Sequence, residues 1–175
     1  GLIYLQITRG VQKRNHVYKD NLNPTVVIYT IKKGLNDNIT KLSGKKAITY
    51  PDLRWKRRDI KSISLLPNIL AAKAADKKSV YESILIEDNF VTEGTSSNIW
   101  IVKNKTLITH PANSDILKGI TRDSIKSIIK KNNLKFLEKK IKKDQLYKSD
   151  EVFLTSSSCF VTPIIKIDNK LINKG

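Results

Sequence analysis

The sequence has a single cysteine, Cys159, and no methionine. One cysteine cannot close a disulfide within the chain, and the two histidines, His16 and His110, are far apart and offer no zinc-ligand spacing. We therefore expect no metal centre and no disulfide scaffold, and a reducing cytoplasm fits this cysteine usage.

Long apolar runs are also absent. No stretch approaches the ~20 residues that span a bilayer, and no signal peptide is visible. The glycine-rich signatures of nucleotide sites, GxGxxG and the P-loop, are missing as well. We therefore expect no membrane partner and none of the usual nucleotide sites.

Acidic residues are scarce beside the basic ones: 16 Asp and Glu against 33 Lys and Arg leave a net charge of +17. A nucleic-acid surface would explain this charge, and so would a composition rich in Lys, Ile and Asn. The densest basic run, 135–143, alternates with Leu137 and Ile141 and indicates a solvated face. Because no nucleic-acid motif is present, we expect no such partner, and a basic nucleic-acid-binding module stays a distant alternative.

Apolar patterning predicts many short strands and two substantial helices, which together indicate an α+β fold. Hydrophobic residues make up 39% of the chain, enough for an ordinary core. Helices are predicted at 64–78 and 121–132, with a short one at 143–148, and Asp168-Asn169 should form a tight turn. Strands are predicted at 2–8, 25–31, 45–50, 53–55, 82–87, 98–109, 134–141, 151–155 and 160–167.

The pattern of apolar residues changes about one fifth of the way along the chain. Residues 32–44 lose apolar periodicity, and we place an interdomain linker at 32–38, between units at 1–31 and 39–175. Gly1 leads at once into a predicted strand and the chain stops just after a hairpin. We therefore expect a fragment that lacks N-terminal sequence and a short C-terminal piece.

Two segments have the chemistry of an anion site. Gly119-Ile120-Thr121 enters a predicted helix and supplies free backbone N–H groups, a hydroxyl and the positive end of the helix dipole. Taken alone, a simple N-cap by Thr121 is the commoner interpretation. The run 155–158 places four small hydroxyl residues at a strand end, where plain loop chemistry is the alternative. Together the two segments favour one shared phosphate.

Two further residues could serve an electron-withdrawing cofactor. Glu93 lies among hydroxyl residues and Gly94 just before an apolar strand, where a carboxylate could keep a pyridine nitrogen protonated. Lys61 lies between Ile60 and Ser62, beside an apolar segment. On position alone, a surface turn acid and a solvated lysine are the commoner interpretations of these two residues.

Arg14 and His16 stand in the long loop between the first two predicted strands. Alternate residues of an extended segment point to one side, so both side chains could meet one carboxylate. A surface basic loop is the equal alternative.

These features, in this order, resemble the class IV, fold-type IV aminotransferases, and within them those that act on D-amino acids such as D-alanine. The resemblance extends over essentially the whole chain, and the ordered set is far more specific than any one block. It rests on Gln6-Ile7-Thr8-Arg9-Gly10, Lys13-Arg14-Asn15-His16, Asp52-Leu53-Arg54-Trp55, Asp59-Ile60-Lys61-Ser62 with Leu65-Leu66, Thr92-Glu93-Gly94-Thr95-Ser96-Ser97-Asn98, Thr109-His110-Pro111, Leu117-Lys118-Gly119-Ile120-Thr121-Arg122 and Thr155-Ser156-Ser157.

The resemblance implies roles around pyridoxal 5'-phosphate. Lys61 is implied to hold the cofactor covalently and to move a proton between it and the substrate α-carbon, and Glu93 to pair with its pyridinium nitrogen. The ring is implied to lie against Leu117 and near Ser96 and Ser97.

The phosphate and the substrate are implied to bind elsewhere on the chain. Gly119, Ile120 and Thr121, with Ser156 and Ser157, are implied to bind the phosphate. Arg14 and His16 resemble the pair that traps the substrate α-carboxylate, which in the family reaches across a homodimer interface.

The implied reaction is transamination between a D-amino acid and a 2-oxo acid, in a ping-pong cycle. Branched-chain L-amino acid aminotransferases and aminodeoxychorismate lyases share the Lys61 and Glu93 blocks and are the alternatives. They do not typically carry the Arg-x-His pair, which favours the D-amino acid group. Residues 1–31 are implied to be the last strands of a small N-terminal domain, and 39–175 most of the large, C-terminally incomplete cofactor domain.

Overall fold

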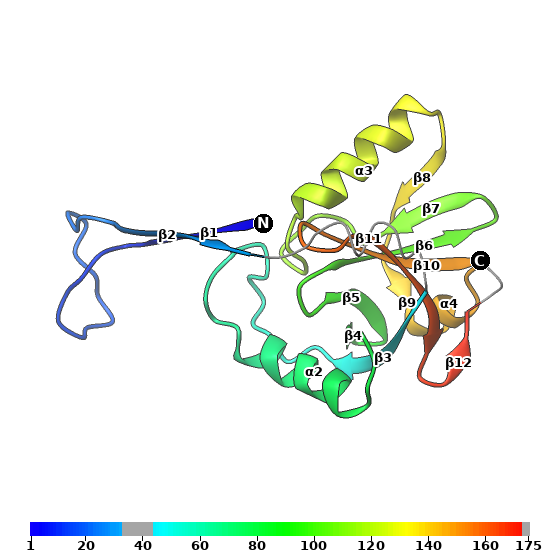
Figure 1. The fold of residues 1–175 in the computed structure, drawn as a ribbon, viewed down its shortest axis with the longest axis horizontal. Helices are drawn as coiled ribbons and strands as arrows, with labels where there is room; N and C mark the ends of the chain where they lie inside the picture. Colours follow the sequence, from blue (N-terminus) through cyan, green and yellow to red (C-terminus); the bar gives the residue numbers. More distant parts are fainter. Residues whose placement is uncertain (33–43, 173–175) are drawn as a thin grey trace. The chain divides into compact units, whose positions relative to one another are not determined.

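The computed structural model describes residues 1–32 and 44–172 (Figure 1). The chain divides into two compact units, 1–37 and 38–175. The predicted linker, 32–38, lies outside the described residues except for Lys32, so its role stays a prediction.

The first unit is an antiparallel hairpin. Strand β1 (Leu2–Thr8) pairs with β2 (Thr25–Ile31) along its whole length, from Leu2 opposite Ile31 to Thr8 opposite Thr25. Both strands were predicted from their β-branched and aromatic residues, and both are confirmed. The 9–24 loop connects them.

The second unit is built on one mixed sheet with the strand order β8-β7-β6-β10-β11-β3-β4-β5-β9, and β12 pairs with β11. The β11–β3, β3–β4 and β7–β8 pairs are parallel and the others antiparallel. Helix α2 packs on β3 and β4, and α3 packs on β10 (Figure 1). The strands are β3 (Lys45–Pro51), β4 (Glu82–Glu87), β5 (Phe90–Gly94), β6 (Asn98–Lys103), β7 (Thr106–Thr109), β8 (Lys135–Glu138), β9 (Ile141–Lys142), β10 (Glu151–Ser156), β11 (Phe160–Ile167) and β12 (Lys170–Leu171); the helices are α2 (Leu66–Lys77), α3 (Ile120–Lys131) and α4 (Lys143–Tyr147). The α+β prediction is confirmed.

The core of this unit is formed by aliphatic side chains of the sheet, among them Ile84, Ile99, Leu154 and Ile167, each almost fully buried. Such runs of β-branched and aliphatic residues are what a strand covered on both faces requires. The buried core fixes the strand ends from which the polar residues of the cavity project. In the described residues no helix is long and apolar enough to cross a membrane.

A tight turn divides one of the predicted strands in two. The predicted strand 98–109 is two strands, β6 and β7, because Asn104 and Lys105 both take positive φ angles, of 49° and 59°. Two such residues form the hairpin turn that matches strand twist. Asp168-Asn169 makes the same kind of turn, as predicted, with φ angles of 46° and 69°.

Other predicted strands also differ. The segment 134–141 contains β8 and β9 separated by two residues, and the short strand β5 was not predicted, because its Thr92 and Glu93 are polar. The strand predicted at 53–55 is wrong. There the Asp52 carboxylate accepts hydrogen bonds from the Arg54 backbone N–H and side chain, which turns the chain away from the sheet.

Candidate active site

A cavity of about 630 Å³ lies within the second unit, between the 52–65 segment, α2, the 93–98 turn, the start of α3 and the end of β10. All the residues that sequence analysis assigned to the cofactor line it: Lys61, Glu93, Ser96, Ser97, Leu117, Gly119, Ile120, Thr121, Ser156 and Ser157. Residues nearly a hundred positions apart thus face one space. Their individual roles stay predictions.

Glu93, on β5, is a buried carboxylate that accepts hydrogen bonds at both oxygens. Arg54 Nη1 donates to Oε1, Asn98 Nδ2 donates to Oε2 over 3.1 Å, and the Leu117 backbone N–H lies 3.1 Å from each oxygen. Burial raises the pKa of Glu93 to about 6, against the opposing effect of the Arg54 charge. The structure thus places an acid that titrates near neutrality in the cavity wall.

Arg54 is held by a second acid, Asp52. Its Nε and Nη2 donate to Asp52 Oδ1 and Oδ2 over 2.9 and 2.7 Å, and Thr92 Oγ1 donates to the same carboxylate over 2.6 Å. Burial alone would raise the pKa of Asp52, but the hydrogen bonds from Arg54 and Thr92 outweigh it, so the pKa is lowered. Asp52 is therefore a firm anionic anchor for the guanidinium.

Lys61 lies in the segment between β3 and α2, and its side chain is exposed at the cavity. The segment is anchored by buried Arg58, which donates to Glu87 Oε2 and Oε1 over 3.0 and 2.8 Å. The Arg58 backbone N–H also donates to the Ser114 carbonyl over 3.0 Å. The hydrogen bonds of Arg58 thus hold the segment in place, and the Lys61 amine on it remains exposed.

The first turn of α3 offers unpaired backbone donors. Gly119 is the N-cap, and among the residues that the structure describes no side chain caps the helix. The N-cap interpretation of Thr121 is therefore wrong: Thr121 lies inside the first turn. A Cβ on Gly119 would stand 2.3 Å from Asn98 Oδ1, which explains why glycine occupies this position. The uncapped turn, with Ile120 and Thr121 lining the cavity, is suited to an anion.

The end of β10 adds hydroxyl groups on the same cavity. Thr155 Oγ1 accepts a hydrogen bond from Trp100 Nε1 over 3.0 Å, and Ser156 Oγ accepts one from the Cys159 backbone N–H over 3.2 Å. Thr155 Oγ1 therefore keeps its own proton for an anion in the cavity. Ser156 Oγ also lies 3.2 Å from Ser158 Oγ and 2.9 Å from Cys159 Sγ, so the hydroxyl and thiol groups of this turn share their protons. Ser157 follows in the turn and also lines it.

The 94–97 turn is fixed by Glu82 of β4, which is buried. Glu82 Oε1 accepts from Thr95 Oγ1 over 2.7 Å and Oε2 accepts from Ser97 Oγ over 2.8 Å. Ser97 is therefore buried with its proton committed, whereas Ser96 is exposed. Of the two serines, Ser96 is the one free to donate into the cavity.

This donor set fits pyridoxal 5'-phosphate. The group needs an amine for its aldehyde, an acid for its ring nitrogen and donors for a dianionic phosphate. Lys61, Glu93 and the uncapped α3 turn supply these three chemistries in one cavity.

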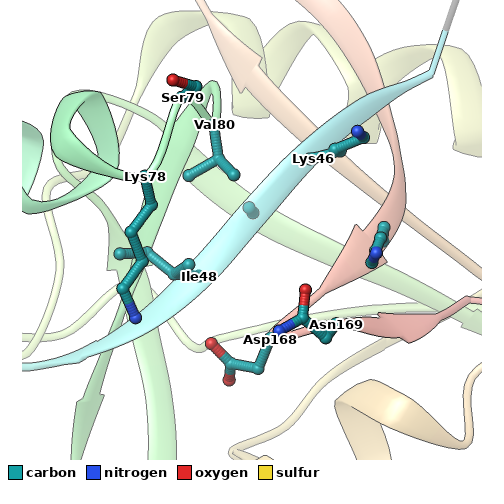
Figure 2. Close-up of a pocket in the computed structure, with 9 residues that line it drawn as sticks. Lys46, Ile48, Lys78, Ser79, Val80, Asp168 and Asn169 are labelled. Carbon is teal, nitrogen blue, oxygen red and sulfur yellow. The ribbon is translucent and has the colours of Figure 1, made fainter.

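A second hollow, of about 490 Å³, lies over β3 between the end of α2 and the β11–β12 turn (Figure 2). Its lysines include Lys78 at the C-cap of α2, where a cation complements the helix dipole. Its carboxylate, Asp168, already accepts hydrogen bonds from Thr49 and Tyr147. These groups are accounted for by the fold, so we assign the chemistry to the larger cavity.

Arg14 and His16 belong to the first unit and are exposed. The segment that carries them is bent rather than extended, because Asn15 Oδ1 accepts a hydrogen bond from the Val17 backbone N–H over 3.1 Å. The alternation of side chains along an extended segment therefore does not explain the directions of the Arg14 and His16 side chains. Their assignment to substrate stays a prediction.

The residues that support Glu93 were not predicted from the sequence. Arg54 and Asn98 bond to it, Asp52 holds Arg54, and Glu82 holds the following turn. The available signal was charge at alternate positions, Asp52 and Arg54, directly after a strand, where a buried ion pair is one explanation. That signal does not reveal which acid across the sheet completes the set.

Comparisons with known proteins bear on the family and on the fold. The sequence pattern of the family described as amino-transferase class IV matches residues 1–167. The chain is 43% identical over 177 aligned residues to a D-alanine aminotransferase of Bacillus licheniformis; the match covers 100% of this chain and 62% of that relative. The chain thus spans less than two thirds of the length of this curated relative.

Solved structures show the same fold. The branched-chain aminotransferase of Thermoproteus uzoniensis, solved with norvaline, has a TM-score of 0.79 and 29% identity, over 99% of this chain and 60% of that one. The branched-chain amino acid aminotransferase of Escherichia coli has a TM-score of 0.82 over 98% and 59% of the two chains, and at 24% identity it supports the fold alone. The fold-type IV prediction is confirmed, and this chain belongs to the class IV aminotransferase family.

Proposed function

We propose that this chain is the greater part of a pyridoxal-phosphate-dependent enzyme that transfers an amino group between a D-amino acid, such as D-alanine, and a 2-oxo acid. The observation that carries the proposal is the single cavity lined by an exposed amine, a buried acid and an uncapped helix turn. The 43% identical D-alanine aminotransferase supports the substrate class.

Each residue then has a task that its contacts allow. The Lys61 amine, exposed on an anchored segment, would hold the cofactor through its aldehyde. When the substrate amine takes that place, the released Lys61 amine would accept the substrate α-proton and return it. Glu93 holds a proton at the ring nitrogen, and the α3 turn with Ser156 and Ser157 binds the phosphate. When bound, the cofactor withdraws electrons from the bond that breaks at the α-carbon.

We assign recognition of the substrate carboxylate to Arg14 and His16. A guanidinium binds a carboxylate through two parallel hydrogen bonds, and an imidazole can add a third. We further propose that residues 1–31 and 39–175 are the two domain parts, and that the enzyme is a homodimer. Leu66 and Leu70 on α2 remain 67% and 48% exposed and lie outside the cavity lining, an apolar face that a second copy would bury.

The first test uses the full-length protein that carries this chain. Borohydride should reduce a cofactor–lysine adduct, remove its near-visible absorbance and leave a modified peptide at Lys61. Lys118 lines the same cavity and provides the matched control. Lys61→Arg should abolish the adduct and Lys118→Arg should keep it; an adduct on Lys118 would contradict the assignment.

A second test separates the substrate classes. D-alanine with 2-oxoglutarate should give pyruvate, and L-leucine with 2-oxoglutarate should give no product. The opposite result would favour a branched-chain L-amino acid aminotransferase, the alternative to which the 29% identical Thermoproteus uzoniensis structure belongs. Arg14→Leu should raise KM for D-alanine and leave the Lys61 adduct intact, since the cofactor cavity lies in the other unit.

A further inference from the structure

All the groups that hydrogen-bond to Glu93 are donors among the described residues. They are the Arg54 guanidinium, the Leu117 backbone N–H and the Asn98 side-chain amide. The orientation of that amide is settled by its second contact, because Asn98 Nδ2 also lies 2.9 Å from the Leu117 carbonyl, which can only accept. A proton on Glu93 therefore finds no acceptor among these three partners, which favours the ionised form of a side chain that lines the cavity.

The side chain of Arg54 is held in place, so its Nη1 stays directed at Glu93. Two of its nitrogens form a fork with Asp52, leaving Nη1 directed at Glu93. The side chain of Arg54 is only 8% exposed and that of Asp52 is fully buried. A lysine could supply the charge at this place but not the fork, because its ammonium has no planar geometry.

We propose that Arg54 is a positioning residue, which through its fork to Asp52 holds Glu93 as a carboxylate in the cavity wall. The inference rests on the proposed function, since it gives Glu93 a purpose at the ring nitrogen. It adds a residue outside the predicted set and explains why two acids, Asp52 and Glu93, share one arginine.

The groups around Glu93 determine whether loss of Arg54 raises or lowers the Glu93 pKa. Burial is the largest influence and raises the pKa of Glu93; Arg54 lowers it, the Leu117 N–H lowers it, and the Asp52 charge raises it. Asn98 of β6 is neutral. Loss of Arg54 therefore removes the main force that keeps Glu93 ionised at neutral pH.

The test replaces Arg54 and, as a matched control, Arg58. Arg58 is a buried arginine of the same segment whose ion pairs, within the described part of the chain, are with Asp52 and Glu87 rather than with Glu93. In the cofactor-free full-length protein, the ¹³C signal of the Glu93 carboxyl group is titrated. Arg54→Gln should raise the Glu93 pKa by about one unit or more, and Arg58→Gln should shift it far less while still lowering stability.

In the loaded enzyme the acid limb of kcat/KM should move to higher pH in Arg54→Gln and stay in place in Arg58→Gln. An unmoved Glu93 titration in Arg54→Gln, or equal shifts in both variants, would overturn the inference. Should Arg54→Gln fail to fold, Arg54→Lys decides: without the fork, a smaller rise is expected, and an unchanged value counts against it. The cofactor-free titration stands even if no Lys61 adduct forms, so the two proposals fail separately.

Discussion

Glu87 and Glu93 lie near each other in sequence on the paired strands β4 and β5, and each contacts an arginine of the same segment, yet they titrate at opposite ends of the acid range. Glu87 is bonded to Arg58 and Lys56, which lower its pKa to about 2. Glu93 is bonded to Arg54, and its pKa is nevertheless raised to about 6. The difference is burial: the side chain of Glu87 is 20% exposed and that of Glu93 6%.

An arginine partner alone therefore does not decide the charge of a carboxylate. Glu87 keeps part of its hydration and has two cations, so attraction outweighs desolvation. Glu93 has lost its hydration and shares its one arginine with Asp52. The first arrangement suits an anchor for the segment that carries Lys61, and the second suits an acid that must respond to what enters the cavity.

The largest predicted effect is a difference in kcat between the Glu93 and Glu87 variants. Glu93→Gln removes the charge that would hold the ring nitrogen proton, so kcat for D-alanine should fall by about a hundredfold or more. Glu87→Gln weakens only the anchor of Arg58 and should cost less than about tenfold. Steady-state kinetics at saturating cofactor measures both, and equal losses would remove the distinction drawn between an anchor and a responsive acid.

The next largest effect is on stability against pH, where the two residues have opposite signs. The Glu87 pKa is depressed, so its contribution is full above its unfolded value near 4.5 and is lost as pH falls toward 2. The Glu93 pKa is raised, so its contribution is full below about 4.5 and is lost as pH rises through about 6. Each contribution is on the order of 1 to 3 kcal/mol.

Urea unfolding of the cofactor-free protein across this range, with each glutamate changed to glutamine, gives the measurement. The difference in unfolding free energy between wild type and Glu87→Gln should narrow on acidification from pH 5 to 3, values that bracket the ordinary pKa. For Glu93→Gln, the pH-dependent part of the difference in unfolding free energy should instead favour wild type less as the pH rises from 5 to 7. Parallel curves would mean that burial does not separate the two residues.

A third effect tests the neutral donor to Glu93. Gly119→Ala would place a Cβ 2.3 Å from Asn98 Oδ1 and force the amide that donates to Glu93 to move. We expect a loss of about 1–2 kcal/mol in the free energy of unfolding and a further rise in the Glu93 pKa. A control on the same helix is Ser127→Ala, at an exposed position of α3. A Glu93 titration that is the same in both variants would show that Asn98 contributes nothing to it.

Much of the fold and the composition of the cavity could be predicted from sequence, and the reasons are physical. Strands such as β1, β2 and β4 follow from local side-chain patterns, and the ordered motifs point to Lys61, Glu93 and Thr121. The fork of Arg54 could not be predicted, because it joins residues 52, 54 and 93 through strand pairing at long range. The turn at Asn104-Lys105 was missed for a local reason, since Lys rarely adopts a positive φ.

The smallest effect is expected at the exposed end of the Glu87 pair. Lys56 bonds to Glu87, but its side chain is 73% exposed, so solvent screens the attraction. Lys56→Ala should change the free energy of unfolding by no more than about 0.5 kcal/mol, whereas Arg58→Ala should cost about 3 kcal/mol because it leaves buried Asp52 with one cation fewer. Urea unfolding at low and high salt measures both, and salt should diminish only the Lys56 effect. A large, salt-independent loss in Lys56→Ala would mean that Glu87 behaves as a buried acid, and burial would then no longer explain why the pKa values of Glu87 and Glu93 differ.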